Sequence, residues 1–266
     1  MSQQPPQSLI DAFLQHYSKF FASGSHQDKG LKVLQWTLWL FAYRLQQTSA
    51  AGSSSHTVSK ALRKLYNEVT FTRYLLRFYG LPDALLAFRT GGWTVGSSKF
   101  AKFLGSLMAL CMVGYYPLEH VAYVKWMLPP SLQSSSSSRK GWHTAESLSA
   151  YSCRFWLVYL IAESTQTSLS LWRLYREQEQ AIKDNHQSEE ASDNNNNEQD
   201  DFSVAIRSHQ LQLARSLLFT LPCYSWSLPN WDTQPWLPEG TCHGLLWIES
   251  VVSMVQAIRS YRIRQQ

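Results

Sequence analysis

Apolar residues recur at helical spacing along most of the chain, whereas the strict alternation typical of strands is scarce. Between residues 9 and 20 the apolar positions follow steps of three and four. A second series, in DKGLKVLQWTLWLFAYRL, places Leu31, Leu34, Leu38, Phe41 and Leu45 on one continuous stripe, which is typical of a helix in a bundle. We therefore predict two N-terminal helices, with a break at 24–29 between them and a small-residue loop at 46–57 after them.

The stretch LRKLYNEVTFTRYLLRFYG, residues 62–80, combines many apolar residues with regularly returning cations. On a helix, Ala61, Leu62, Leu65 and Val69 share one face, and most of the cations lie away from it. Such a helix either lies on a membrane surface or packs on protein with its cations in water, and the residue pattern alone leaves both open. The candidate membrane-binding residues are Lys60, Leu62, Arg63, Lys64, Leu65, Val69, Arg73, Leu76 and Arg77. The sequence Gly80-Leu81-Pro82 should end or kink this helix.

Two further stretches are apolar enough to raise the question of membrane insertion. Residues 103–118 form a run of 16 without a charge, which as a helix spans about 24 Å, less than the roughly 30 Å of hydrocarbon in a bilayer. The run is compatible with a short spanning helix, a dipping helix or a buried bundle helix. The C-terminal helix expected at 240–264 is marginal, because Glu249 opposes insertion about as strongly as its aliphatic residues favour it. Glu249, Ser253 and Gln256 share one side, so a helix facing that side would make insertion plausible.

The predicted fold is all-α. We expect a single membrane-associated helical bundle over residues 1–266, with one amphipathic membrane-remodelling helix and one or more short or marginal transmembrane helices. A long helix is expected at 147–182 and another at 202–221. The irregular segments expected are a Ser-rich loop at 128–141, an acidic, Asn-rich disordered loop at 183–201 and a Trp/Pro-rich loop at 221–240.

The distribution of charge along the chain indicates what kind of partner the protein binds. The formal net charge is +5, but residues 183–201 carry one base and seven acids, so the rest of the chain carries +11. A cationic, apolar chain favours an anionic partner, either nucleic acid or a membrane surface. No base-reading motif is present, so nucleic acid is not expected. Aromatic residues make up 14% of the chain, with 11 Trp, and Trp and Tyr suit membrane interfaces.

No pattern in the chain predicts catalysis, a metal site or a cofactor. The four cysteines form no CxxC pair, and Cys242-His243 is interpreted as incidental. GGWTVGSS, residues 91–98, has the glycine spacing of a phosphate loop, but Ser97 stands where the lysine belongs and no strand precedes it. The eight histidines are scattered. We therefore expect a protein that is not an enzyme.

Three stretches together resemble the peroxin eleven family, the peroxisomal membrane-elongation proteins. They are DKGLKVLQWTLWL at 28–40, KALRKLYNEVTFTRYLLRFYGLPDALLAF at 60–88, and GLLWIESVVSMVQAIRSY at 244–261. The long helix at 147–182 fits the family in order and character, whereas the Ser-rich and Asn-rich segments look like insertions.

The resemblance implies a peroxisomal membrane protein whose amphipathic segment inserts into the leaflet, bends it and promotes elongation before fission. It further implies self-association and engagement of a dynamin-related GTPase and its membrane adaptors. A membrane pore and a soluble helical scaffold remain the alternatives. The sequence shows neither a secretory signal nor a peroxisomal import tripeptide, so the expected location is the peroxisomal membrane through apolar helices.

Overall fold

The computed structural model describes residues 9–48, 54–128, 144–187 and 195–263, and these residues are helical with short turns and no strand. The all-α prediction is confirmed. The helices are α1 Leu9–Phe21, α2 Gly24–Thr48, α3 Ser54–Arg77, α4 Gly80–Thr90, α5 Lys99–Met127, α6 Ala145–Gln187, α7 Asn195–Ser227 and α8 Glu239–Ile263.

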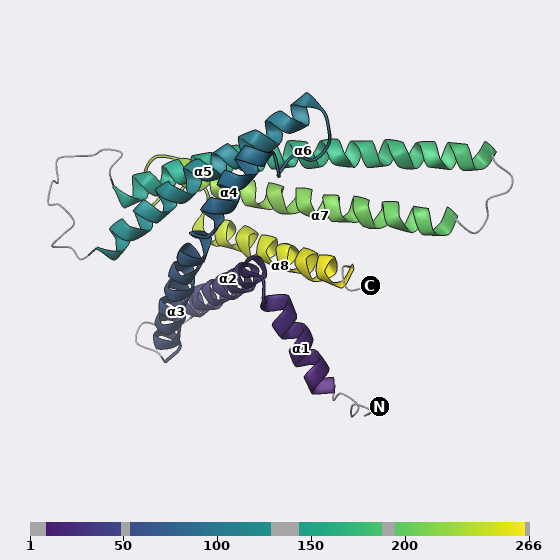
Figure 1. Cartoon of the computed structure of the whole chain (residues 1–266). Coiled ribbons are helices and arrows are strands. Elements are labelled where there is room, and N and C mark those ends of the chain that lie inside the picture. The colour runs from purple at the N-terminus through teal and green to yellow at the C-terminus, as the bar shows by residue number, and fades with distance from the viewer. Residues whose placement is uncertain (1–8, 49–53, 129–143, 188–194, 264–266) are drawn as a thin grey trace, which may run out of the picture.

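Long antiparallel helices form the body of the molecule (Figure 1). Helix α6 packs against α5 on one side and α7 on the other, and α8 packs against both α2 and α7. Helix α3 packs mainly on α2, and α4 packs on α5. In Figure 1, α3 runs steeply across the direction of α6 and α7, α1 extends away from the body, and the far ends of α6 and α7 project beyond the other helices.

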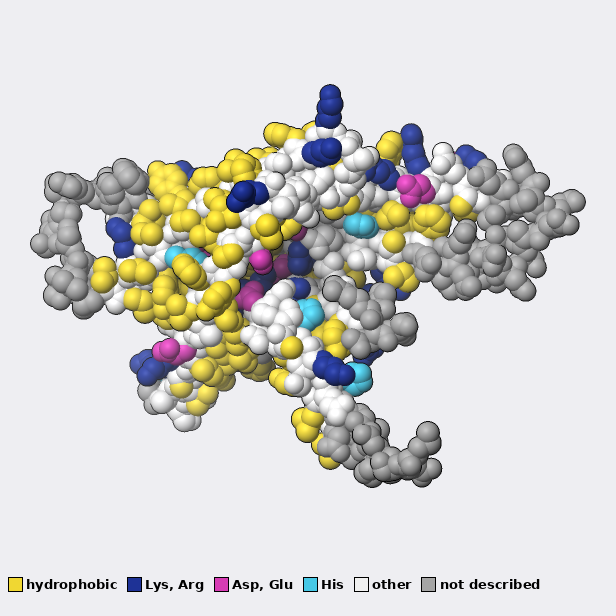
Figure 2. Space-filling view, viewed as in Figure 1, with side chains coloured by type: hydrophobic (Ala, Val, Ile, Leu, Met, Phe, Trp, Pro, Cys, Tyr) yellow, Lys and Arg dark blue, Asp and Glu magenta, His cyan; other side chains and the backbone are white. Residues whose placement is uncertain are grey.

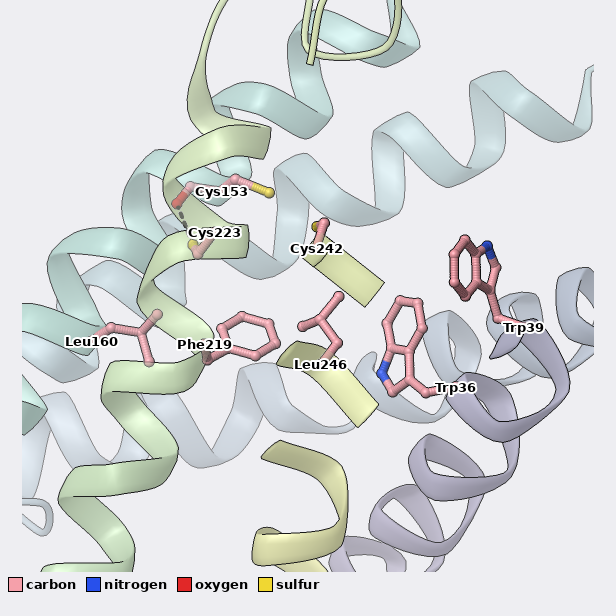
Figure 3. Packing of buried hydrophobic residues seen from close by; sticks show 8 residues of the cluster. All are labelled: Trp36, Trp39, Cys153, Leu160, Phe219, Cys223, Cys242 and Leu246. Carbon is pink, nitrogen blue, oxygen red and sulfur yellow. Dashed lines mark hydrogen bonds between the residues drawn. The ribbon is translucent and has the colours of Figure 1, made fainter. Parts of the chain in front are cut away.

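The main core lies where α2, α6, α7 and α8 meet (Figure 3). Trp39, Cys223 and Leu246 are completely buried there. The four cysteines are free and buried, and the Cys223 thiol donates to the Cys153 carbonyl oxygen at 3.3 Å. This core joins segments from both halves of the sequence, so α2 is held in place by the C-terminal helices.

The apolar stripe expected to pack α2 into the bundle lies largely outside the core. Leu34 and Phe41 are exposed, whereas the inward face carries Lys32, Gln35 and Trp36. The predicted residues do share one face of α2, but the prediction that this face packs into the bundle was wrong. Tryptophans and paired polar groups fill the interior instead.

Several predicted boundaries differ from the structure. Residues 24–29 begin α2 and do not break the helix; the break is the turn at 22–23. Helix α7 continues through Pro222 to Ser227, which shortens the expected Trp/Pro loop. The two ends of the predicted acidic loop, residues 183–187 and 195–201, are helical and belong to α6 and α7, because each of these helices continues along its antiparallel partner. Residues 188–194 of that segment, and the Ser-rich loop apart from Leu128, lie outside the described residues.

Replacing Leu246 by Ala should lower the free energy of unfolding by about 2–5 kcal/mol, because a fully buried leucine leaves a cavity. The neighbouring Ile248 is exposed on the same helix, so Ile248→Ala is the matched control and should change stability much less in detergent. Thermal unfolding followed by circular dichroism in detergent measures both. Equal losses would contradict the placement of the core.

Candidate functional site

The interior between the helices contains charged side chains that are paired across helix boundaries. Arg73 of α3 binds Asp28 of α2, with Nε 2.8 Å from Oδ1, and Arg77 binds Glu119 of α5. Lys32 of α2 binds Glu249 of α8, and Arg215 of α7 lies 3.5 Å from Glu163 of α6. Each pair fixes the position of one helix against another.

Helix α3 turns a polar face toward its neighbours. The Ser59 hydroxyl donates to the Ala42 carbonyl oxygen at 2.8 Å, and the Gln35 amide donates to the Thr70 hydroxyl at 2.8 Å. Arg73 also donates to the side-chain oxygen of Gln35. Polar contacts therefore position this helix, although its sequence contains enough apolar residues to form a conventional apolar contact face.

Burial and pairing shift the pKa values of these groups in directions that follow from their surroundings. Burial acts to lower the pKa of Arg77, but Glu119 and the nearby tyrosines outweigh it and raise that pKa well above its usual value. Burial acts to raise the pKa of Asp28, and the cations led by Arg73 lower it below its usual range. Burial lowers the pKa of Lys32 to about 8, with Glu249 opposing the shift.

The structure divides the nine candidate membrane-binding residues into outward and inward groups. Lys60, Lys64 and Leu65 are exposed, and Leu62 and Leu76 are partly exposed. The other four have partners within the protein. Arg63 contacts Glu239 at 3.2 Å and lies 4.9 Å over the Trp39 ring.

Val69, Arg73 and Arg77 point into the protein. Val69 and Arg73 are buried, and Arg77 is mostly enclosed by its contacts with Glu119 and Tyr115. In this packing they do not present their side chains to an outside surface. Arg73 and Arg77, which lie four positions apart on α3, therefore form an inward pair, because the carboxylates that bind them lie on α2 and α5.

A broad exposed apolar surface covers the end of α3, α4 and α5, and sequence reasoning did not single it out. Figure 2 shows hydrophobic side chains gathered over this part of the molecule. This apolar surface comprises Leu75, Phe78, Tyr79, Leu85, Leu86, Phe88, Phe100, Phe103, Leu110, Val121 and Val124. The α5 members follow helical spacing, but the uniformly apolar run around them hides which side faces outward.

Polar groups inside and apolar groups outside are typical of helical membrane proteins, in which lipid replaces water around the bundle. Within the described residues, two helices are long and apolar enough to cross a membrane by length and composition, namely α5 and residues 239–262 of α8. The polar side of α8 faces helical partners as expected, since Glu249 contacts α2 and Gln256 donates to Gln212 of α7 at 3.1 Å. Fold and surface together fit the class of α-helical membrane proteins.

The particular family follows from comparison with known proteins. The family described as peroxisomal biogenesis factor 11 (PEX11) matches residues 14–221. The chain belongs to this family, which confirms the resemblance read from the sequence. No curated protein and no solved structure matches the chain. The match includes α3, α4 and α5, whereas the resembling stretch at 244–261 lies beyond it.

Membership places the protein in the peroxisomal membrane and assigns it to peroxisome biogenesis and proliferation. The family is one of biogenesis factors and is not a known enzyme family. The location predicted from the sequence is therefore confirmed.

Glu119→Gln should lower the free energy of unfolding by about 3–5 kcal/mol, because it leaves the Arg77 charge enclosed without its carboxylate. A second variant, Arg77→Met with Glu119→Leu, removes both charges and should recover much of that loss. The matched control is Glu179→Gln, which breaks a solvent-exposed pair with Lys183 and should leave stability unchanged within error. Thermal unfolding in detergent tests all three, and equal effects at 119 and 179 would refute the pairing argument.

Proposed function

We propose that the protein bends the peroxisomal membrane with α3 held in the plane of one leaflet, promoting elongation and fission of the organelle. The observation that carries this proposal is the orientation of α3. It runs steeply across α6 and α7 (Figure 1), with Arg73 and Arg77 on the bundle side and with Leu65 and Leu75 outward beside Lys64 and Glu68. If the long helices lie along the membrane normal, α3 lies in the membrane plane.

The geometry supports insertion of α3 into one leaflet while the helix stays packed on the bundle. We call α3 in this role the wedge. Helix α3 has 24 residues, about 36 Å of length, and its occupation of one leaflet expands that leaflet relative to the other. Release of α3 from the bundle would separate Arg73 and Arg77 from their carboxylates, which is costly for buried charges. Insertion of the outward edge of α3 needs no such separation.

Apolar burial supplies most of the lipid affinity in this mechanism. Of the predicted cations on α3, Lys60 and Lys64 are exposed, and each contributes about 1 kcal/mol near an anionic surface. Each exposed Leu or Phe on the apolar surface contributes up to about 1.5–3 kcal/mol when lipid covers it. Self-association and recruitment of a dynamin-related GTPase and its adaptors also belong to the proposal, and they rest on the family resemblance alone.

Leu65→Glu in the full-length protein should reduce tubulation of anionic vesicles by about tenfold or more, because it places a charge in the inserted edge. Asn67→Glu is the matched control, since Asn67 is exposed on the opposite side of α3 and should leave tubulation unchanged. Electron microscopy counts the tubules, and circular dichroism verifies the fold. Tubulation by Leu65→Glu at the wild-type level would exclude α3 as the wedge.

A second candidate function, solute permeation, is favoured by two neighbouring cavities that are partly open to the surface. One has a volume of about 180 Å³ and the other of about 200 Å³. Lys32, Trp156 and Phe219 line both cavities. If the two cavities connect inside a membrane-embedded bundle, their charged and polar lining groups would favour the passage of small polar solutes.

Reconstituted protein should release a small polar dye from vesicles if these cavities conduct. Phe219→Val removes part of the wall that the cavities share and should raise the release rate several-fold. Leu217→Val is the control, because Leu217 is exposed on the same helix. Dye fluorescence measures the rate, and identical rates with protein-free vesicles would rule out permeation.

A further inference from the structure

Exposed cations from three helices gather near one end of the bundle. We call this set the basic belt: Lys99, Lys102, Arg173, Arg176, Arg259 and Arg262. Five of them are exposed and Arg173 is partly exposed. They lie far apart in the sequence, so only the packing brings them to a common level.

Helices α5 and α6 share this level through the contact of Arg173 with the loop before α5. A Cβ added to Gly96 would lie 2.4 Å from Nη1 of Arg173, so the guanidinium occupies the space beside that glycine. Helix α5 begins three residues later at Lys99. The first lysines of α5 therefore lie near Arg173 and Arg176.

Helices α7 and α8 are tied to the same level by amide side chains. The Gln210 amide of α7 donates to the Tyr175 hydroxyl of α6 at 2.9 Å. Less than one turn along α7, Gln212 accepts from Gln256 of α8 at 3.1 Å. Arg259 follows Gln256 by about one turn, which brings the end of α8 to the level of Tyr175.

The belt differs from the interior cations in having no carboxylate within ion-pair distance, although Arg176 contributes, after Lys183, to lowering the pKa of the nearby Glu179 carboxyl. Within the part of the chain that the structure describes, none of its six members forms an ion pair, whereas Arg73 and Arg77 each have one. The belt also contains aromatic groups. Trp172 is 53% exposed, and the Arg176 guanidinium lies 4.0 Å over its ring. Unpaired cations beside exposed Trp and Tyr are typical of the level at which lipid headgroups meet water.

A second aromatic level lies at the opposite end of α6. The indole N–H of Trp126 donates to the Glu146 carboxylate, and that of Trp231 donates to the Glu146 carbonyl oxygen, both at 3.1 Å. Glu146 and Trp172 are 26 positions apart, about 39 Å along a helix. That separation matches the roughly 40–45 Å of a bilayer with its headgroup regions.

Helix α6 is longer than this interval. Its 43 residues extend about 65 Å, so a helix aligned with the membrane normal must leave the bilayer at one end. The end beyond Trp172 is charged, and with α7 it projects past the other helices in Figure 1. Its residues Glu179 and Lys183 form a solvent-exposed ion pair.

We propose that the basic belt binds the headgroups of anionic phospholipids and fixes the depth of the bundle, leaving the projecting ends of α6 and α7 in water. The partner is the headgroup layer of the bilayer, because its phosphates supply the negative charge that the belt lacks. The apolar side chains of α6 between the two aromatic levels, among them Phe155, Val158 and Ile161, then face the hydrocarbon.

Cysteine labelling of the full-length protein in anionic vesicles tests the depth. Gln180→Cys lies beyond the belt and Ile161→Cys between the two levels, and both positions are exposed in the protein. With a charged maleimide on both sides of the membrane, the cysteine at 180 should react about tenfold faster or more, because hydrocarbon excludes the reagent. The wild type supplies the background, since its cysteines are buried. Equal rates at the two positions would overturn the assigned depth.

Energy transfer tests the headgroup partner. A donor dye on Ser168→Cys, one turn before the belt, should transfer about twofold more to acyl-labelled phosphatidylglycerol than to acyl-labelled phosphatidylcholine at equal density. Lys102→Gln with Arg176→Gln should remove about half of that preference. The matched pair Lys183→Gln with Arg207→Gln lies beyond the belt and should retain it. Equal transfer to both lipids, or equal loss in both variants, would refute headgroup binding.

Failure of this proposal is distinguishable from failure of membrane bending by α3. The labelling and energy-transfer measurements report depth and lipid preference, and they do not depend on vesicle shape. The proposal rests on the peroxisomal membrane location and not on the wedge. If the belt variant is destabilised, the labelling comparison still decides the depth, because it changes no charge.

Discussion

The pairing of buried charge is the constraint on which the rest of the structure depends. An unpaired charge between helices costs several kcal/mol, so Arg73 and Arg77 of α3 must meet Asp28 and Glu119. These contacts turn the Arg73 and Arg77 side of α3 inward. Leu65 and Leu75 are left outside beside Lys64 and Glu68, and the same logic applies to α2, where Lys32 is inside and Leu34 outside.

An outside surface built in this way is suited to lipid. The exposed side chains of α4 and α5 continue the apolar edge of α3, and α8 hides its one central carboxylate, Glu249, against Lys32. Membership of the PEX11 family places the protein in the peroxisomal membrane, and in our proposal this surface faces its lipid. With its central charges paired inside, the bundle leaves the apolar side chains of α4 and α5 on its exterior.

Membrane bending by such a bundle requires a fixed depth as well as a wedge. A helix that lies in one leaflet changes curvature only if it stays at that depth, and α3 is held by α2 and α5 rather than by its own cations. In our proposal, the basic belt holds the long helices at the headgroup level and α3 expands one leaflet. Both roles require the same orientation, in which the long helices lie along the membrane normal.

The sequence by itself determined that the protein is helical, where most helices lie, and that its family is that of the peroxisomal elongation proteins. It also indicated that Glu249 and Gln256 would need a helical partner, which α2 and α7 provide. The sequence could not decide which face of α2 or α3 lies inside, or that Arg73 and Arg77 are enclosed. Helical spacing shows only which residues share a face, whereas the carboxylates that draw the cations inward come from other helices. Only the tertiary structure brings those groups together.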